Sequence, residues 1–171
     1  GYYAFPFAVP GGTFRVGLNG CIARPGEDQT GHGTEAYLPA RDWAAVGNEQ
    51  FGVALVQQDS HLVECGMIHA DKQAFGQRPA TGHLYSYLFN DWLYGHAHVI
   101  GPSHMNLRYR YTIYSHAGRF ADAGVPRLAE RVVAPVLSVV IAQEQKGSLP
   151  AGSCSFLSVD APNVELLTLK Q

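Results

Sequence analysis

The chain has little charge and no long hydrophobic run. Charged residues make up 15% of its 171 residues, with a formal net charge of −2, whereas about 25% is typical of soluble domains. This balance provides no basic surface for nucleic acid or for an anionic membrane. No apolar run approaches the ~20 residues that a membrane-spanning helix needs. We therefore expect neither nucleic acid nor a membrane as a partner.

Cysteine is also scarce. The chain has three cysteines, Cys21, Cys65 and Cys154. Without a CxxC pair, neither a zinc knuckle nor a redox motif is available. We interpret all three as reduced and mostly buried thiols of a cytosolic protein. No basic segment followed by an apolar one opens the sequence, so no signal peptide is visible and we expect a cytoplasmic location.

Local motifs of several enzyme classes are missing as well. There is no Walker loop and no GxGxxG. Ser115 and His116 are followed by Asp122, but no GxSxG elbow surrounds the serine. Glu27 and Asp28 are adjacent, so they cannot supply the spaced carboxylate pair of a glycosidase. We assign no catalytic residue to this chain.

What the sequence does contain favours many short strands. Nineteen glycines and ten prolines accompany a hydrophobic fraction of 46%, which is enough to build a core with turns between strands. Strand signals recur about every ten residues, a spacing typical of β-sandwiches. We predict an all-β fold, an antiparallel β-sandwich forming one domain over residues 1–171. One short helical segment is expected near 119–133, where Val125, Leu128 and Ala129 have near-helical spacing.

The clearest strand signal begins after Met105. Leu107, Tyr109, Tyr111 and Ile113 fall on one face of a predicted strand, and the alternate residues fall on the other. The SHAG sequence that follows is expected to break the strand. Arg108 and Arg110 share a face, where they either bind an anion or form ion pairs across strands.

Two pairings are predicted nearer the amino terminus. The Asn19-Gly20 dipeptide is typical of a two-residue hairpin after a strand over 13–18. Residues 51–57 and 61–68 are expected to form an antiparallel pair across a three-residue connection. The first of these has the apolar character of a strand that is buried on both faces.

Further strands are predicted at the carboxyl end. Residues 136–142 form an apolar run that fits a strand, or a continuation of the helix. Residues 155–159 and 164–169 flank a turn at 160–163 and are expected to form a terminal hairpin.

Three histidines are candidate metal ligands. His96 and His98 share a face if they lie on a strand, and His104 follows downstream. Neutral imidazole is a common metal ligand, but a site needs a third or fourth donor. The alternative is that these are ordinary loop histidines.

A second group is a candidate sugar-binding site. Asn90, Asp91 and Trp92 are adjacent, with Tyr94 nearby. An aromatic ring offers an apolar face to a sugar, while amide and carboxylate groups hydrogen-bond to hydroxyls. The alternative is a turn with a buried tryptophan.

Several segments together resemble one known family. They read, in order, YYAFPFAVPGGTFRV, PGEDQ, NEQFGVALVQQDSHLVECG, SYLFNDW, LRYRYTIYSHAG and SFLSVDAPNVELLTLK. In this order and spacing they are similar to the C-terminal β domain of glycoside hydrolase family 38, the α-mannosidases. The similarity covers most of the chain.

This resemblance implies a galactose-mutarotase-like sandwich that is a fragment of a larger multi-domain glycosidase. The parent would hydrolyse α-mannosides with retention, and its zinc and carboxylate nucleophile would lie on an N-terminal catalytic domain. This chain would then carry no cofactor and act as an accessory scaffold, with the catalytic domain and an α-mannoside or other carbohydrate as partners. Asn90, Asp91 and Trp92 would approach the sugar.

Two other functions stay open at this point. One is a free-standing carbohydrate-binding module that uses Trp92 and Tyr94. The other is a small metal-dependent enzyme built on His96, His98 and His104. A half-sandwich would also expose an apolar face, so we expect self-association of the isolated chain.

Overall fold

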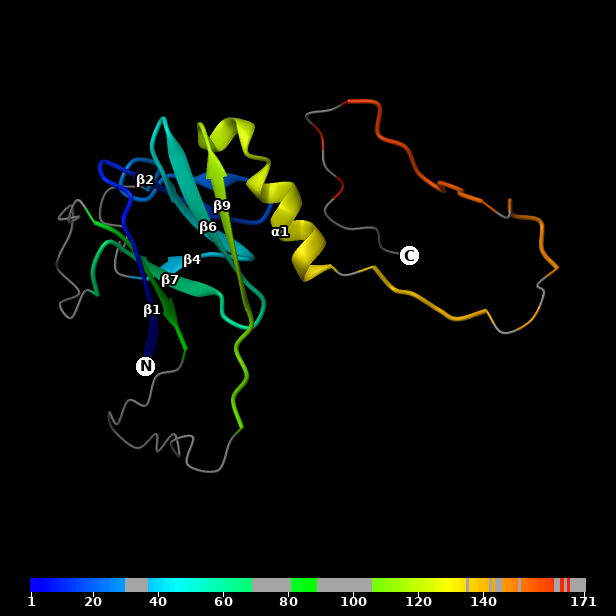
Figure 1. The fold of residues 1–171 in the computed structure, drawn as a ribbon, viewed down its shortest axis with the longest axis horizontal. Helices are drawn as coiled ribbons and strands as arrows, with labels where there is room; N and C mark the ends of the chain where they lie inside the picture. Colours follow the sequence, from blue (N-terminus) through cyan, green and yellow to red (C-terminus); the bar gives the residue numbers. More distant parts are fainter. Residues whose placement is uncertain are drawn as a thin grey trace. The chain divides into compact units, whose positions relative to one another are not determined.

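Two antiparallel β-sheets and one short α-helix form the fold in the described part of residues 1–135 (Figure 1). The computed structural model describes residues 1–29, 37–68, 81–88, 106–134, 136–141, 143, 146–150, 152–161, 164 and 166. The chain divides into two compact units, Gly1–Pro135 and Val136–Gln171. Each unit is described by itself.

The two sheets confirm the predicted all-β antiparallel architecture. The four-stranded sheet has the order β1 (Tyr2–Phe7), β8 (Gly82–Tyr87), β7 (Leu62–Cys65) and β4 (Leu38–Pro39). The five-stranded sheet has the order β3 (Ile22–Ala23), β2 (Thr13–Gly17), β5 (Trp43–Gly47), β6 (Phe51–Gln57) and β9 (Tyr111–Ala117).

The main core lies between the sheets. Both sheets contribute buried apolar side chains to it, because alternate residues of each strand point to the same face. Its buried members are Phe5, Val9, Phe14, Val16, Leu38, Ala40, Ala44, Val46, Leu55, Val63, Cys65 and Leu84. The arrangement is that of a β-sandwich.

A second core lies on the other face of the five-stranded sheet. There α1 (Val125–Val133), preceded by the 3₁₀ turn η2 (Phe120–Asp122), packs over β5 and β6. Val125 and Ala129 lie one helical turn apart and are both buried against this sheet. This helix confirms the predicted helical segment near 119–133.

The Asn19-Gly20 hairpin is confirmed. β2 pairs with β3, and Leu18 N donates to Cys21 O at 2.9 Å across the two-residue turn. Gly20 adopts a φ of 83°, a conformation that two-residue hairpin turns require and that glycine adopts without strain.

The predicted pairing of residues 51–57 with 61–68 is wrong. β6 and β7 belong to different sheets, so the chain crosses from one sheet to the other between them. Polar bonds hold this crossing. Asp59 accepts hydrogen bonds from Arg110 N at 2.8 Å and from its guanidinium at 2.8 and 3.0 Å, and the Ser60 hydroxyl donates to Tyr87 O at 2.6 Å.

The strand after Met105 is displaced relative to the prediction. β9 begins at Tyr111, so Leu107 lies outside it, and it continues through Ala117, so most of SHAG belongs to the strand. The predicted alternation holds within it, because Tyr111 packs on the main core and Tyr114 packs on the helix side. Ile113 remains exposed because β9 is an edge strand.

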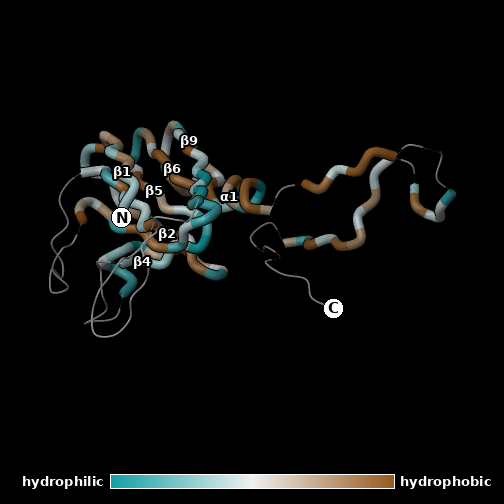
Figure 2. Tube along the Cα trace, turned by 90° about the horizontal axis from the view of Figure 1, so that it is seen from below, coloured by the Kyte–Doolittle hydropathy of each residue, from teal (hydrophilic) through white to brown (hydrophobic). Residues whose placement is uncertain are grey.

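The second unit corrects the predictions for residues 136–141 and 155–159, whereas most of the predicted strand 164–169 lies outside the described residues. Its described residues contain neither a strand nor a helix, including 136–141 and 155–159. A turn is present, with Val164 N donating to Ala161 O at 3.1 Å. Apolar character alone does not form a strand, because a strand needs a hydrogen-bonded neighbour. Figure 2 shows hydrophobic residues along much of this unit.

Cys65 is buried, but Cys21 and Cys154 are exposed, so the prediction of mostly buried thiols is wrong. In the part of the chain described above, no helix has the length and apolar character to cross a membrane.

Two residues that are paired between β6 and β9 should contribute very differently to the free energy of unfolding. Leu55 is fully buried in β6, and its partner Ile113 in β9 is 55% exposed. We expect Leu55→Ala to lower the free energy of unfolding by about 2–5 kcal/mol and Ile113→Ala to lower it by about 1 kcal/mol or less. Urea unfolding followed by tryptophan fluorescence measures both. Equal losses would contradict the sandwich described here.

The Asp59–Arg110 pair predicts a pH dependence of stability. The hydrogen bonds from Arg110 hold the pKa of Asp59 below its usual range. The pair therefore stabilises the fold above the ordinary aspartate pKa of about 4, and this contribution is lost as the pH falls through the folded-state pKa. We expect Asp59→Asn and Arg110→Ala to lose less stability than the wild type on acidification. If the free energy of unfolding of both variants fell on acidification as steeply as that of the wild type, this assignment would be contradicted.

Candidate functional site

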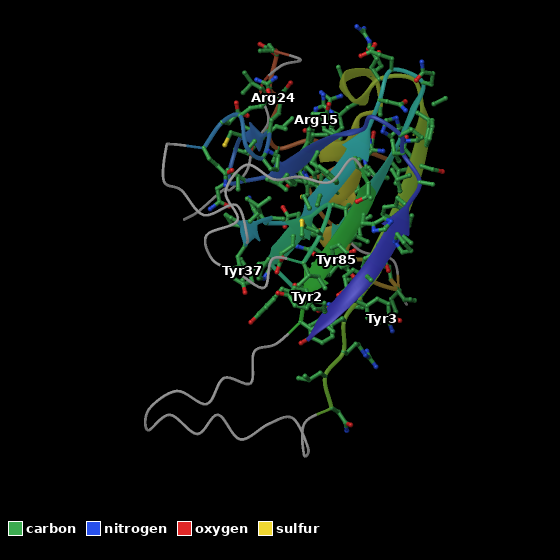
Figure 3. All side chains as sticks on the ribbon, turned by 90° about the vertical axis from the view of Figure 1, so that its left-hand side faces the viewer. Tyr2, Tyr3, Arg15, Arg24, Tyr37 and Tyr85 are labelled. Atoms are coloured by element: carbon green, nitrogen blue, oxygen red, sulfur yellow. The ribbon has the colours of Figure 1, made fainter. Side chains whose placement is uncertain are left out.

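The candidate site lies on the outer face of the four-stranded sheet. Four tyrosines, Tyr2, Tyr37, Tyr85 and Tyr87, surround the carboxylate of Glu64, and we call these five residues the tyrosine cluster. In Figure 3, Tyr2, Tyr37 and Tyr85 gather on one side of the blue β1 strand. All four rings are half-buried.

Strand alternation explains how these residues meet. Tyr2 is paired with Tyr87, and Glu64 is paired with Tyr85, so each pair shares one face of the sheet. The neighbouring Leu84 points inward to the main core, which leaves the tyrosines on the outer face.

The contacts within the tyrosine cluster are specific. The Tyr2 hydroxyl donates a hydrogen bond to Glu64 Oε1 and also interacts with Tyr37. The ring of Tyr87 meets Tyr2 edge to face at 5.1 Å between centroids, and it meets Tyr37 in the same way at 5.5 Å. Such pairs contribute attraction beyond their buried area.

Burial sets the electrostatics of the cluster. Glu64 is fully buried although it belongs to an outer face. Burial, together with the hydrogen bonds to Glu64 and Tyr37, raises the pKa of Tyr2 far above its ordinary value. Burial also raises the pKa of Tyr87. These phenols therefore remain protonated donors throughout the physiological pH range.

The polar surface extends along β8. His83 Nδ1 lies 3.2 Å from the Tyr85 hydroxyl, and the two rings meet edge to face. The face thus combines apolar ring surface with phenol and imidazole groups, and the carboxylate of Glu64 is buried beneath them. It offers hydrogen bonds and ring contacts to a ligand rather than a nucleophile. Among the described residues, no group of three or more His, Cys, Asp or Glu side chains is placed to hold a metal ion.

The site residues predicted from sequence lie outside the described part of the chain. These residues are Asn90, Asp91, Trp92, Tyr94, His96, His98 and His104. Their proposed roles stay predictions.

Other candidates are described, and the structure gives them local partners. Ser115 and His116 occupy successive positions of β9, so their side chains point to opposite faces and do not form a catalytic pair. Arg110 forms the ion pair with Asp59 rather than an open anion site. Arg24 binds both Glu27 and Asp28, at 2.7 and 3.5 Å.

Sequence reasoning missed the tyrosine cluster because its members come from four separate segments. Tyr2 and Glu64 are 62 residues apart, and no local motif connects them. One signal was present: Glu64 stands in an otherwise apolar strand, and a charged residue there is rarely buried without a hydrogen-bonding partner.

Comparison with models of protein families, with curated protein sequences and with solved structures gives no significant match. The function is therefore argued from the residues and from the fold.

The Tyr2–Glu64 hydrogen bond predicts a contrast between neighbouring tyrosines. Tyr2→Phe removes a donor from a buried carboxylate, so we expect the free energy of unfolding to fall by about 1.5–3 kcal/mol. Tyr3 is 57% exposed on the other face of β1, and Tyr3→Phe should change it by less than about 0.5 kcal/mol.

The difference in unfolding free energy between the wild type and Tyr2→Phe should also change at alkaline pH. Because the pKa of Tyr2 is raised on folding, its stabilising effect is complete below the unfolded-state pKa of about 10 and declines above it. The stability gap between the wild type and Tyr2→Phe should therefore narrow at alkaline pH. Denaturant unfolding across that range measures the gap, and a constant or widening gap would contradict the assignment.

Proposed function

We propose that this chain is an accessory, scaffolding β domain of a family 38-type α-mannosidase. Retaining hydrolysis of α-mannosides would take place on a separate catalytic domain, which would carry the zinc ion and the carboxylate nucleophile. The chain itself would be inactive, and its cytoplasmic location stays a prediction from sequence.

The position of the resembling segments supports the proposal. FGVALV forms most of β6, and YTIYSHA forms β9. The two strands pair along their whole length, from Phe51 opposite Ala117 to Gln57 opposite Tyr111. The family-like segments are therefore structural elements of the sheet, as a scaffold requires.

The exposed second unit is the observation that carries the proposal. Val136, Leu137, Val139 and Val140 are 85–94% exposed, and Phe156 is 84% exposed. Apolar surface of this extent favours a protein partner, since burying it is worth about 25 cal/mol per Å². In the parent enzyme that partner would be the catalytic domain. Alone, the chain would self-associate through the same surface.

Depletion from an extract tests the proposal. We expect an antibody raised against the chain to recognise a polypeptide much longer than 171 residues in cells that express it. The same antibody should remove α-mannosidase activity, whereas pre-immune antibody should leave it. A band of the chain's own size, with the activity left in solution, would overturn the proposal.

Activity assays on the purified chain distinguish the scaffold function from a metal-dependent enzymatic function of the chain itself. Under the scaffold proposal it should not hydrolyse a chromogenic α-mannoside, with added zinc or with chelator. Chelator-sensitive turnover with stoichiometric bound metal would instead favour a metal-dependent enzyme that uses His96, His98 and His104.

A further inference from the structure

We propose that the free edge of β9 pairs with β9 of a second copy of the chain, so that the two five-stranded sheets join into one continuous antiparallel sheet about a two-fold axis. This inference goes beyond the scaffold function and does not depend on it. It concerns a different surface from the apolar second unit, because β9 belongs to the first unit.

The backbone of β9 has hydrogen-bonding groups that its own sheet leaves unused. β9 is the last strand in the order of the five-stranded sheet, and among the described strands only β6 pairs with it. At one end of this pairing Gln58 N donates to Arg110 O at 3.2 Å, and at the other end Gly118 N donates to a carbonyl of the β5–β6 turn at 2.7 Å. Because hydrogen-bonded pairs alternate along an antiparallel ladder, the even-numbered residues of β9 bond to β6. The odd-numbered residues point their N–H and C=O groups to the free edge, and these are Tyr111, Ile113, Ser115 and Ala117.

The side chains along this edge are exposed. Ile113 is 55% exposed, and Ser115 and Ala117 are exposed as well. Tyr3, from β1 of the other sheet, is 57% exposed, and its ring lies 5.9 Å from the ring of Tyr111 between centroids. Tyr3, Tyr111 and Ile113 thus form an apolar row beside the unused backbone groups, and an added strand covers such a row while it bonds to the edge.

β9 also lacks the features that keep edge strands from pairing. Native edges are commonly blunted by charged side chains, by proline, by a bulge or by short length. β9 has seven residues, none of them Lys, Arg, Asp, Glu or Pro, and it runs in unbroken register with β6. The other terminal strands of the two described sheets are protected, because β1 contains Pro6 and because β3 and β4 have two residues each. β9 is therefore the edge best suited to pair with another strand.

The strand is complementary to a second copy of itself. In an antiparallel pair centred on Tyr114, Ile113 lies opposite Ser115 of the second copy, and Tyr111 lies opposite Ala117 of the second copy. All of these opposed residues point their backbone groups to the free edge, so every N–H and C=O there gains a partner. No like charges face each other, and the two exposed Ile113 side chains become diagonal neighbours across the axis. The contact is isologous and closes as a dimer.

The size of the contact sets the expected affinity. It joins the seven residues of β9 from each copy, with Tyr3 beside them, whereas a standard interface has about 20–30 residues a side. A contact this small gives a weak, reversible dimer. We expect a dissociation constant of about 10–100 μM.

Hydrogen exchange of backbone amides, measured by NMR on the full chain at rising concentration, tests the proposal. The amides of Ile113 and Ser115 should exchange about fivefold or more slowly in concentrated solution than in dilute solution, because only the monomer leaves them unbonded. The amides of Thr112 and Tyr114 bond to β6, so their protection should not depend on the dimer. Sedimentation velocity on the same samples should show a monomer–dimer equilibrium.

A charge at the edge should weaken the dimer. Ile113→Lys brings two lysines close together across the axis, and we expect it to raise the dissociation constant by about tenfold or more. Ile22→Lys is the matched control, because Ile22 is 45% exposed on β3, the edge strand at the other end of the same sheet, and the dimer should be retained. If Ile113→Lys does not fold, Ser115→Pro replaces it, since it removes an outward N–H and leaves the bonds to β6 in place.

Several results would overturn the proposal. These are fast exchange of the Ile113 and Ser115 amides at every concentration, and an unchanged dissociation constant in a folded edge variant. Full protection of these amides in the dilute monomer would mean that another part of the same chain covers the edge. Protection that Val139→Lys removes would assign the edge to the second unit of another copy. The depletion experiment above does not involve β9, so the scaffold function and this dimer can each fail alone.

Discussion

The burial of one strand on both of its faces is the constraint on which the rest of the structure depends. β6 contributes Leu55 to the core between the sheets, and it contributes Ala54 and Val56 to the core under α1. Its backbone is paired on both sides, with β5 and with β9. Because successive side chains of β6 point to opposite faces, a register shift of one residue would exchange the two cores. The helix and the second sheet are therefore both positioned by this strand.

Polar bonds between the sheets complete this positioning and connect the core to the candidate site. The Tyr111 hydroxyl donates to Ser86 Oγ at 3.0 Å, Ser86 Oγ donates to Gln57 Oε1 at 3.3 Å, and Gln57 Nε2 donates to Ala40 O at 3.1 Å. Buried polar groups are costly unless they are satisfied, so this chain of bonds favours one alignment of the two sheets. With Ser86 held inward, strand alternation turns Tyr85 and Tyr87 outward, where they meet Glu64.

The sequence predicted the features that depend on neighbouring residues. Asn19-Gly20 carries its turn conformation in two residues, and Val125 with Ala129 carries a helical face in one turn. The features that failed depend on distant partners. A three-residue connection after β6 fits either a hairpin or a crossing, and the choice is made by Asp59 with Arg110, which lies 51 residues further along the chain. The tyrosine cluster was not predictable for the same reason.

The second unit and the tyrosine cluster differ in what they gain from a partner. The second unit exposes aliphatic side chains such as Val136 and Leu137, which have no polar group to keep in water, so only lasting burial against protein improves their free energy. In the tyrosine cluster the Tyr2 phenol is bonded to Glu64, the Tyr85 phenol lies beside His83, and the apolar area is carried on amphipathic rings. Such a face keeps its polar groups bonded and is stable in water without lasting burial. The aliphatic surface of the second unit therefore favours permanent assembly, whereas the tyrosine cluster does not require it.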